Sequence, residues 1–208
     1  MKISDLFSVQ GKVAVVTGGS RGIGEMIAAG YLINGAKVYI SSRKKDQCDA
    51  TAKRLSETYG AECISIPANL SELSGIESLV AELTKREDHI DILVNNAGRD
   101  TRHSFSALEP QGWDEAINVN LRHQFFAAQA VIPGMIKNGG GSIINLGSTV
   151  VAMAAGNMAA YVTAKAGVQG MTRALARDVG MHRIRVNCIQ PGWVMTQRQM
   201  DNWYDETS

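Results

Sequence analysis

The sequence is poor in cysteine. Cys48, Cys63 and Cys188 are odd in number, widely separated and without a CxxC spacing. Neither a disulfide framework nor a zinc site is therefore expected, and reduced thiols suit the cytoplasm. The histidines also match no metal-ligand spacing, so no metal site is predicted. Structural or surface roles are expected for His89 and His182. A role at a site stays open for His103 and His123.

The sequence also lacks an excess of charge and any long apolar run. It holds 21 Lys plus Arg against 20 Asp plus Glu, for a net charge of +1. Such a balance gives no reason to expect a nucleic acid or an anionic membrane as partner. The first residues, "MKISDLFSVQGK", have no apolar signal core, and no run approaches the ~20 apolar residues that span a bilayer. A small-molecule substrate in the cytoplasm is predicted.

Short β-rich runs alternate with longer helical patterns. Strands are predicted at 12–17, 36–41, 62–67, 90–95, 141–146 and 184–189, with helical spacing in segments such as 22–35 and 74–87. This βα rhythm predicts a doubly wound parallel sheet with helices on both faces. No linker or repeat interrupts it, so residues 1–208 are treated as one domain. After Pro191 the pattern ends in a predicted loop or short helix suited to covering a pocket.

A glycine-rich turn joins the first predicted strand to a helix. In "VVTGGSRGIG", Gly18, Gly22 and Gly24 follow the spacing G-x-x-x-G-x-G. Glycine lets such a turn tighten and lets the backbone approach a pyrophosphate, which lies against the unpaired N–H groups at the helix N-terminus. The alternative is ordinary strand-to-helix punctuation. The position after the first strand of a βαβ series favours binding of a dinucleotide.

The second predicted strand ends in a basic turn. It reads "YISSRKK", where an NAD site usually presents an acidic residue to the adenosine ribose. Arg43, together with Arg21 in the glycine turn, matches the geometry and charge of a 2′-phosphate. A solvated basic turn is the alternative. The pattern predicts NADP(H) as the cofactor, with NAD(H) as the alternative.

Polar side chains follow the fourth and fifth predicted strands. The segment "ILVNNAG" closes the fourth strand with Asn95 to Gly98, where the adenosine side of a cofactor would lie. The asparagines can also tie neighbouring strands together, and both roles can hold at once. Ser148 follows the fifth strand. Tyr161 and Lys165 then lie four residues apart, on one face of a predicted helix. A hydroxyl, a phenol and an ammonium are thus predicted near one sheet edge.

In this order, the motifs resemble those of the short-chain dehydrogenase/reductase family. The matches are "TGGSRGIG", "NNAG", Asn120 in "NVNL", Ser148 thirteen residues before Tyr161 in Y-x-x-x-K, and "PGWVMT". Each motif alone is weak, but the ordered set from Lys12 to Thr196 is specific. The resemblance implies a Rossmann-like fold and a nicotinamide-dependent oxidoreductase acting on CH–OH groups.

The resemblance also implies a role for each matching residue. Tyr161 is the expected general acid/base, Lys165 binds the nicotinamide ribose and lowers the tyrosine pKa, and Ser148 orients the substrate oxygen. Asn120 is expected to hold a water in a proton relay. The expected cofactor contacts are Gly18, Ser20, Arg21, Gly22, Ile23, Gly24, Arg43, Asn69, Leu70, Asn96, Ala97, Gly98, Tyr161, Lys165, Pro191, Gly192, Val194 and Thr196.

Two parts of the sequence resemble different branches of the family. Residues 1–98 resemble NADPH-dependent 3-oxoacyl reductases, and the chain from Arg99 onward resembles sugar 1-dehydrogenases that oxidise aldoses to lactones. An aldose or another polyhydroxylated compound is the expected substrate, and a 3-oxoacyl thioester of acyl carrier protein or CoA is the alternative. Several convergent hydrogen-bonding groups would suit the sugar: Asp100, Arg102, His103, Gln197, Arg198 and Trp203.

The sequence departs from the family at its end. Family members continue into another helix and a further edge strand, whereas this sequence ends at Ser208. A domain truncated at its C-terminus relative to the family is therefore expected, with the strand at 184–189 at the sheet edge. A catalytically silent dinucleotide-binding subunit stays an alternative function. Because related proteins pair through helices at about 112–137 and 159–180, which here are rich in small and apolar residues, a homodimer or homotetramer is expected.

Overall fold

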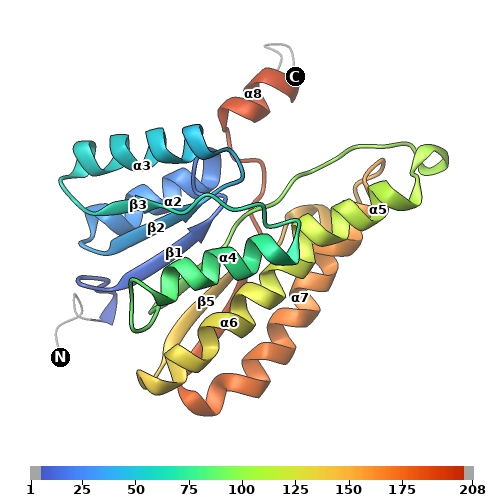
Figure 1. Ribbon diagram of the computed structural model, residues 1–208. Coiled ribbons are helices and arrows are strands. Elements are labelled where there is room, and N and C mark those ends of the chain that lie inside the picture. Colours follow the sequence, from blue (N-terminus) through green and yellow to red (C-terminus); the bar gives the residue numbers. More distant parts are fainter. Residues whose placement is uncertain (1–5, 204–208) are drawn as a thin grey trace.

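The computed structural model describes residues 6–203. Within that range one parallel sheet has the strand order β3-β2-β1-β4-β5-β6 (Figure 1). The predicted strands are confirmed, the last two with the predicted bounds and the others with shorter ends. They are β1 (Val13–Thr17), β2 (Lys37–Ser41), β3 (Cys63–Ser65), β4 (Ile92–Asn95), β5 (Gly141–Leu146) and β6 (Ile184–Ile189).

Helices cover both faces of this sheet, as the βα rhythm predicts. On one face, α2 (Gly22–Ile33) and α3 (Lys45–Tyr59) pack over β1, β2 and β3. On the other, α4 (Leu73–Thr84), α6 (His123–Lys137) and α7 (Ala159–Val179) lie side by side in Figure 1. The remaining elements are α5 (Pro110–Ile117), α8 (Gln197–Trp203), the 3₁₀ turns η1 (Phe105–Ala107), η3 (Thr149–Val151) and η4 (Gly180–His182), and the π-helical turn η2 (Asn118–Arg122).

Strands β1, β2 and β4 carry mostly apolar side chains on both faces, and both faces are buried. Val15, Leu93 and Ile143 belong to the cluster beneath α4, α6 and α7, whereas Val16 and Val94 belong to the cluster beneath α2 and α3. Each is almost fully inaccessible to solvent. Burying one such side chain contributes about 1.5–3 kcal/mol. The two cores fix the strand ends from which the loops of the site project.

The strand order reverses between β1 and β4. From β1 the chain moves outward to β2 and β3, then returns to β4 and moves outward again to β5 and β6. In such sheets the loops at the carboxyl ends of the two central strands diverge to opposite faces and leave a crevice. The glycine turn after β1 and the "NNAG" segment after β4 therefore lie next to each other.

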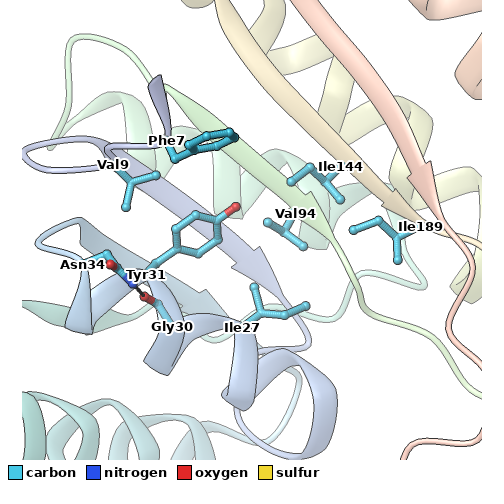
Figure 2. Close-up of a pocket in the computed structure, with 9 residues that line it drawn as sticks. All are labelled: Phe7, Val9, Ile27, Gly30, Tyr31, Asn34, Val94, Ile144 and Ile189. Carbon is cyan, nitrogen blue, oxygen red and sulfur yellow. Dashed lines mark hydrogen bonds between the residues drawn. The ribbon is translucent and has the colours of Figure 1, made fainter. Parts of the chain in front are cut away.

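A separate apolar pocket of about 380 Å³ lies between α2 and the strands β4, β5 and β6 (Figure 2). Its lining includes Phe7, Tyr31, Val94, Ile144 and Ile189, the last of which is 51% exposed. It shares no residue with the large cavity described below. β6 is an edge strand within the described residues, as predicted. Within residues 6–203, no helix combines the length and apolarity needed to cross a membrane.

Candidate active site

One large cavity of about 1850 Å³ opens at the carboxyl ends of the strands. It is lined by the loops that follow the six strands, β1 to β6. The volume exceeds the ~300–1,000 Å³ of a usual small-molecule pocket, as a dinucleotide with a second ligand requires. All eighteen predicted cofactor residues line it, together with Ser148; they are Gly18, Ser20, Arg21, Gly22, Ile23, Gly24, Arg43, Asn69, Leu70, Asn96, Ala97, Gly98, Tyr161, Lys165, Pro191, Gly192, Val194 and Thr196.

The glycine turn between β1 and α2 has a backbone that side chains would disrupt. Gly18 and Gly22 have φ angles of +67° and +58°, in the left-handed region. A Cβ atom on Gly24 would lie 2.3 Å from the Gly18 carbonyl oxygen. Arg21 precedes α2 in an extended conformation, and its side chain makes no capping hydrogen bond. The first N–H groups of α2 therefore face the cavity without a side-chain cap, which suits an anion.

The asparagines after β4 hold strands together. Asn95 donates to the Asn145 side chain at 2.9 Å and to the Gln124 carbonyl at 3.1 Å, and it is fully buried. Asn96 donates through Nδ2 to the Thr17 and Gly18 carbonyls at 2.9 and 3.2 Å. The tying role left open by the sequence is thus seen for both. Asn96 also lines the cavity, so a contact with a cofactor is compatible with it.

The hydroxyl, phenol and ammonium predicted for one sheet edge do come together. Ser148 follows β5, and its Oγ accepts from the Val150 backbone N–H at 3.4 Å. Lys165, on α7, is 3% exposed and donates to the Leu146 carbonyl at 2.7 Å. Its Nζ lies 5.6 Å from the centre of the Tyr161 ring. The i, i+4 spacing thus places the ammonium beside the phenol, at the end of β5.

The ionisation of this pair is governed by burial. Burial raises the pKa of Tyr161, while a hydrogen bond with Ser148 acts in the opposite direction. Burial also lowers the pKa of Lys165 to about 8. The ammonium is held by the Leu146 carbonyl. The lowering of the Tyr161 pKa that the family resemblance implies for Lys165 stays a prediction.

Asn120 is the one predicted catalytic residue that does not line the cavity. It is fully buried in η2, the π-helical turn between α5 and α6. Its Oδ1 accepts from the Arg99 N–H at 2.9 Å, and its Nδ2 donates to the Arg99 and Ala116 carbonyls at 3.1 and 2.9 Å. The side chain thus clamps the loop after β4. A place in a proton relay stays a prediction for Asn120.

Gln124 is a buried polar residue that sequence reasoning missed. Its side chain is fully buried and donates to the Asn120 carbonyl at 3.0 Å and to the Leu146 carbonyl at 3.5 Å. It therefore joins the π-helical turn to the end of β5, where Lys165 also donates. Its spacing of four residues from Asn120 on a helix is the signal that points to it.

His123 lies one position before Gln124, and no described residue hydrogen-bonds either nitrogen of its fully buried ring. Burial lowers its pKa to about 3, and Lys165 adds to this effect. The folded protein therefore keeps this ring neutral at pH values where the unfolded chain, with a His pKa of about 6.5, is protonated. The stability of the fold falls as the pH drops from about 6.5 towards 3.

We expect His123→Leu to reduce this acid sensitivity. Between pH 7.5 and pH 5, His123 takes up a proton in the unfolded chain but not in the folded protein. This difference lowers the free energy of unfolding by about 2 kcal/mol, because pH 5 lies roughly 1.5 pH units below the unfolded pKa. Urea unfolding at both pH values measures the change in the free energy of unfolding. That change should be smaller in the variant than in the unmodified protein, and equal changes would contradict the buried, neutral state of His123.

The structure places some, but not all, of the residues predicted to contact substrate in the cavity. Asp100, Arg102, Gln197 and Arg198 line the cavity. His103 is not among its lining residues; its backbone N–H donates to the Asn157 carbonyl at 2.7 Å. The side chain of Trp203 lies outside the described residues. The sequence did not indicate that Arg198 and Asp100 form an ion pair, with 2.7 Å between Nη2 and Oδ1.

Comparison with known proteins agrees with this architecture. The short chain dehydrogenase family matches residues 12–207. D-xylose 1-dehydrogenase of Caulobacter vibrioides is 43% identical over 197 residues, which cover 95% of this chain and 77% of the relative. The rhamnolipids biosynthesis 3-oxoacyl-[acyl-carrier-protein] reductase of Pseudomonas aeruginosa is 39% identical over 191 residues, covering 89% and 74%.

A solved structure shares the fold closely. L-sorbose reductase from Gluconobacter frateurii, complexed with NADPH and L-sorbose, superposes with a TM-score of 0.91 at 30% identity, over 93% of this chain and 74% of that one. The family match covers most of the chain, and the sequence motifs, the sheet order and the cavity agree with it. The chain therefore belongs to the short-chain dehydrogenase/reductase family.

Proposed function

We propose that this oxidoreductase transfers a hydride between NADP(H) and the C1 carbon of an aldose or a similar polyhydroxylated compound. The observation that carries the proposal is a single cavity lined by the uncapped N-terminus of α2, by Arg43 and by the group of Ser148, Tyr161 and Lys165. A dinucleotide extending along this cavity would reach from the basic turn to the phenol. The cofactor and the substrate would thus both fit in one site.

The residues present fit a nicotinamide dinucleotide. Gly18 and Gly24 let the turn pack closely against the start of α2 and the segment after β4, because a Cβ atom at either position would meet backbone atoms. This packing brings the N-terminus of α2 to the cavity, where a pyrophosphate would bind. Asn69 and Leu70 would contact the adenine, and residues 191–196 would lie beside the nicotinamide. When bound, this cofactor supplies the hydride chemistry that no side chain can perform.

The side chains supply orientation and proton transfer. Tyr161 would take the proton of the substrate hydroxyl during oxidation and return it during reduction, and Ser148 would hold the same oxygen by its hydroxyl. Lys165, fixed by the Leu146 carbonyl, would bind the cofactor ribose and keep positive charge beside the phenolate. Burial is the largest effect on the pKa of Tyr161 and raises it, so positive charge beside the phenolate would favour its formation.

We expect Arg43→Ala to weaken NADPH binding roughly 10- to 100-fold and to leave NADH binding nearly unchanged. Arg43 follows β2 and lines the cavity, and its guanidinium would pair with the phosphate that only NADPH carries. Fluorescence titration with both cofactors measures the change. Lys45→Ala is the matched control, because it removes the same charge from a neighbouring side chain that pairs with Asp49 at 2.5 Å. Tighter binding of NADH than NADPH to the unmodified protein would overturn the preference.

Two observations favour an aldose over a 3-oxoacyl thioester. The substrate end of the cavity carries the charged residues Asp100 and Arg198, whereas an acyl chain requires an apolar groove. The xylose dehydrogenase is 43% identical to this chain. The reductase named for 3-oxoacyl-[acyl-carrier-protein], at 39% identity, keeps that thioester as the second candidate.

The decisive experiment follows nicotinamide absorbance with a panel of substrates. Aldoses with NADP⁺ are expected to produce NADPH, and acetoacetyl thioesters with NADPH are expected to react slowly. Efficient reduction of the thioester with no turnover of any aldose would establish the second candidate instead. Binding of NADPH without turnover of either class would support the silent subunit.

We also propose a homo-oligomer located in the cytoplasm. The candidate surface is the helical layer formed by α5, α6 and α7. Trp113, Phe125 and Ile136 are 37–40% exposed on α5 and α6. Apolar side chains on adjacent helices suit the packing of a second copy.

A further inference from the structure

Two segments that lie 98 residues apart meet across the cavity. Asp100 belongs to the loop after β4, and Arg198 is the second residue of α8. The Arg198 Nη2 atom lies 2.7 Å from Asp100 Oδ1 and donates to the Asp100 backbone carbonyl at 3.1 Å. One guanidinium nitrogen therefore binds both the side chain and the main chain of Asp100, which sets the position of α8 over this loop.

The loop that carries Asp100 approaches the catalytic group: a Cβ at Gly98, two residues before Asp100, would lie 3.5 Å from Lys165 Nζ, which lies 5.6 Å from the centre of the Tyr161 ring. Among the charges that act on the pKa of Tyr161, Asp100 raises it and Arg198 lowers it. All three side chains line the same cavity. A substrate oxygen bonded to Tyr161 and Ser148 would therefore place the neighbouring carbons of the substrate beside the pair.

Much of the pair's hydrogen-bonding capacity faces no described partner. The contacts between the two side chains, and that with the Asp100 carbonyl, use one carboxylate oxygen and one guanidinium nitrogen. A carboxylate has about four acceptor positions and a guanidinium has five donors. The side chains are only 20% and 38% exposed, so a ligand that fills the cavity removes most of their remaining water. Such a ligand must itself offer donors and acceptors, or the buried charges lose hydrogen bonds.

We propose that Asp100 and Arg198 form the substrate-recognition pair of this site, which binds hydroxyl groups next to the reacting carbon of a neutral polyhydroxylated substrate. The inference rests on the proposed function and names the residues that select its substrate. A hydroxyl donates to the carboxylate and accepts from the guanidinium, so a vicinal diol satisfies both partners at once.

The pairing also disfavours two other classes of substrate. The positive charge of Arg198 is already balanced by Asp100 at 2.7 Å, so a carboxylate or phosphate on the substrate would meet the repulsion of Asp100. An acyl chain would desolvate both charges without offering them a hydrogen bond. The pair can bind neutral hydroxyl groups without this repulsion and without losing hydrogen bonds.

The test compares a parent aldose with a set of aldoses that each lack one hydroxyl, using NADP⁺ and the unmodified protein, Asp100→Asn and Arg198→Gln. In the unmodified protein, removal of at least one hydroxyl is expected to lower kcat/KM by about 10- to 100-fold. In both variants that preference is expected to shrink at least fivefold, mainly through KM. Arg198→Lys, which keeps the charge but not the planar fork, should retain an intermediate preference.

Glu82→Gln is the control, because it breaks the Lys85–Glu82 ion pair of 2.7 Å, which does not line the cavity, and should leave the preference intact. NADPH titration and thermal unfolding identify any variant that fails to fold, and Arg198→Lys then carries the comparison. An equal loss of kcat/KM for parent and deoxy aldoses in Asp100→Asn, with aldose turnover intact in the unmodified protein, overturns the recognition role alone. Absence of aldose turnover in the unmodified protein overturns the proposed substrate and the recognition role together.

Discussion

Replacing Tyr161 by Phe is expected to lower kcat at least about a hundredfold while leaving NADPH affinity nearly unchanged. The substitution removes the atom that we propose exchanges a proton with the substrate oxygen, and general acid–base catalysis contributes about 10²–10⁴-fold to rate. It preserves the ring beside the Lys165 ammonium, 5.6 Å away in the unmodified protein. Stopped-flow measurement of the hydride step and titration with NADPH separate the two effects.

Tyr31→Phe is the control for this substitution. Tyr31 lies on α2 and lines the separate apolar pocket of Figure 2, so loss of its hydroxyl should change neither rate nor cofactor affinity. Comparable turnover by Tyr161→Phe and the unmodified protein would show that another group transfers the proton. A large fall in NADPH affinity would instead assign Tyr161 a binding role.

The sequence predicts the fold well because the two signals that it offers, apolar runs and the order of the motifs, can be read directly along the chain. Apolar runs such as 141–146 are buried on both faces of the sheet, and they form the strands expected from them. The order of the motifs also identifies the family, which the comparisons confirm. Parallel strands bring their carboxyl ends to one edge, so the predicted residues in the loops after all six strands gather around one cavity.

What the sequence does not predict are contacts between segments that are distant along the chain. Nothing local to Asp100 or Arg198 indicates that they form an ion pair, because their meeting depends on where α8 crosses the cavity. Asn120 is similar: its motif suggests a role, but only the folded loop shows its amide bound to the Arg99 backbone. His123 carries no sequence signal for full burial, since histidine is neither consistently buried nor consistently exposed.

Replacing Gly24 by Ala is expected to weaken NADPH binding more than tenfold and to destabilise the fold by roughly 1–3 kcal/mol, the usual effect of overpacking. The added Cβ would lie 2.3 Å from the Gly18 carbonyl oxygen and 2.5 Å from Asn96 Nδ2. The Gly18 oxygen is a backbone atom, and the Asn96 amide is held by its hydrogen bonds to the Thr17 and Gly18 carbonyls. The start of α2 must therefore move away from the turn, which displaces the N–H groups that would receive the pyrophosphate.

Gly30→Ala provides a control within the same helix. A Cβ at Gly30 meets nothing within 4 Å, and alanine is favoured over glycine in a helix interior by roughly 0.5–1 kcal/mol. This variant should be as stable as the unmodified protein or slightly more so, with the same affinity for NADPH. Thermal unfolding and NADPH titration of both variants measure the difference. If Gly24→Ala binds NADPH as tightly as Gly30→Ala does, the close approach of α2 to the glycine turn is not required for the cofactor, and the proposed pyrophosphate position is wrong.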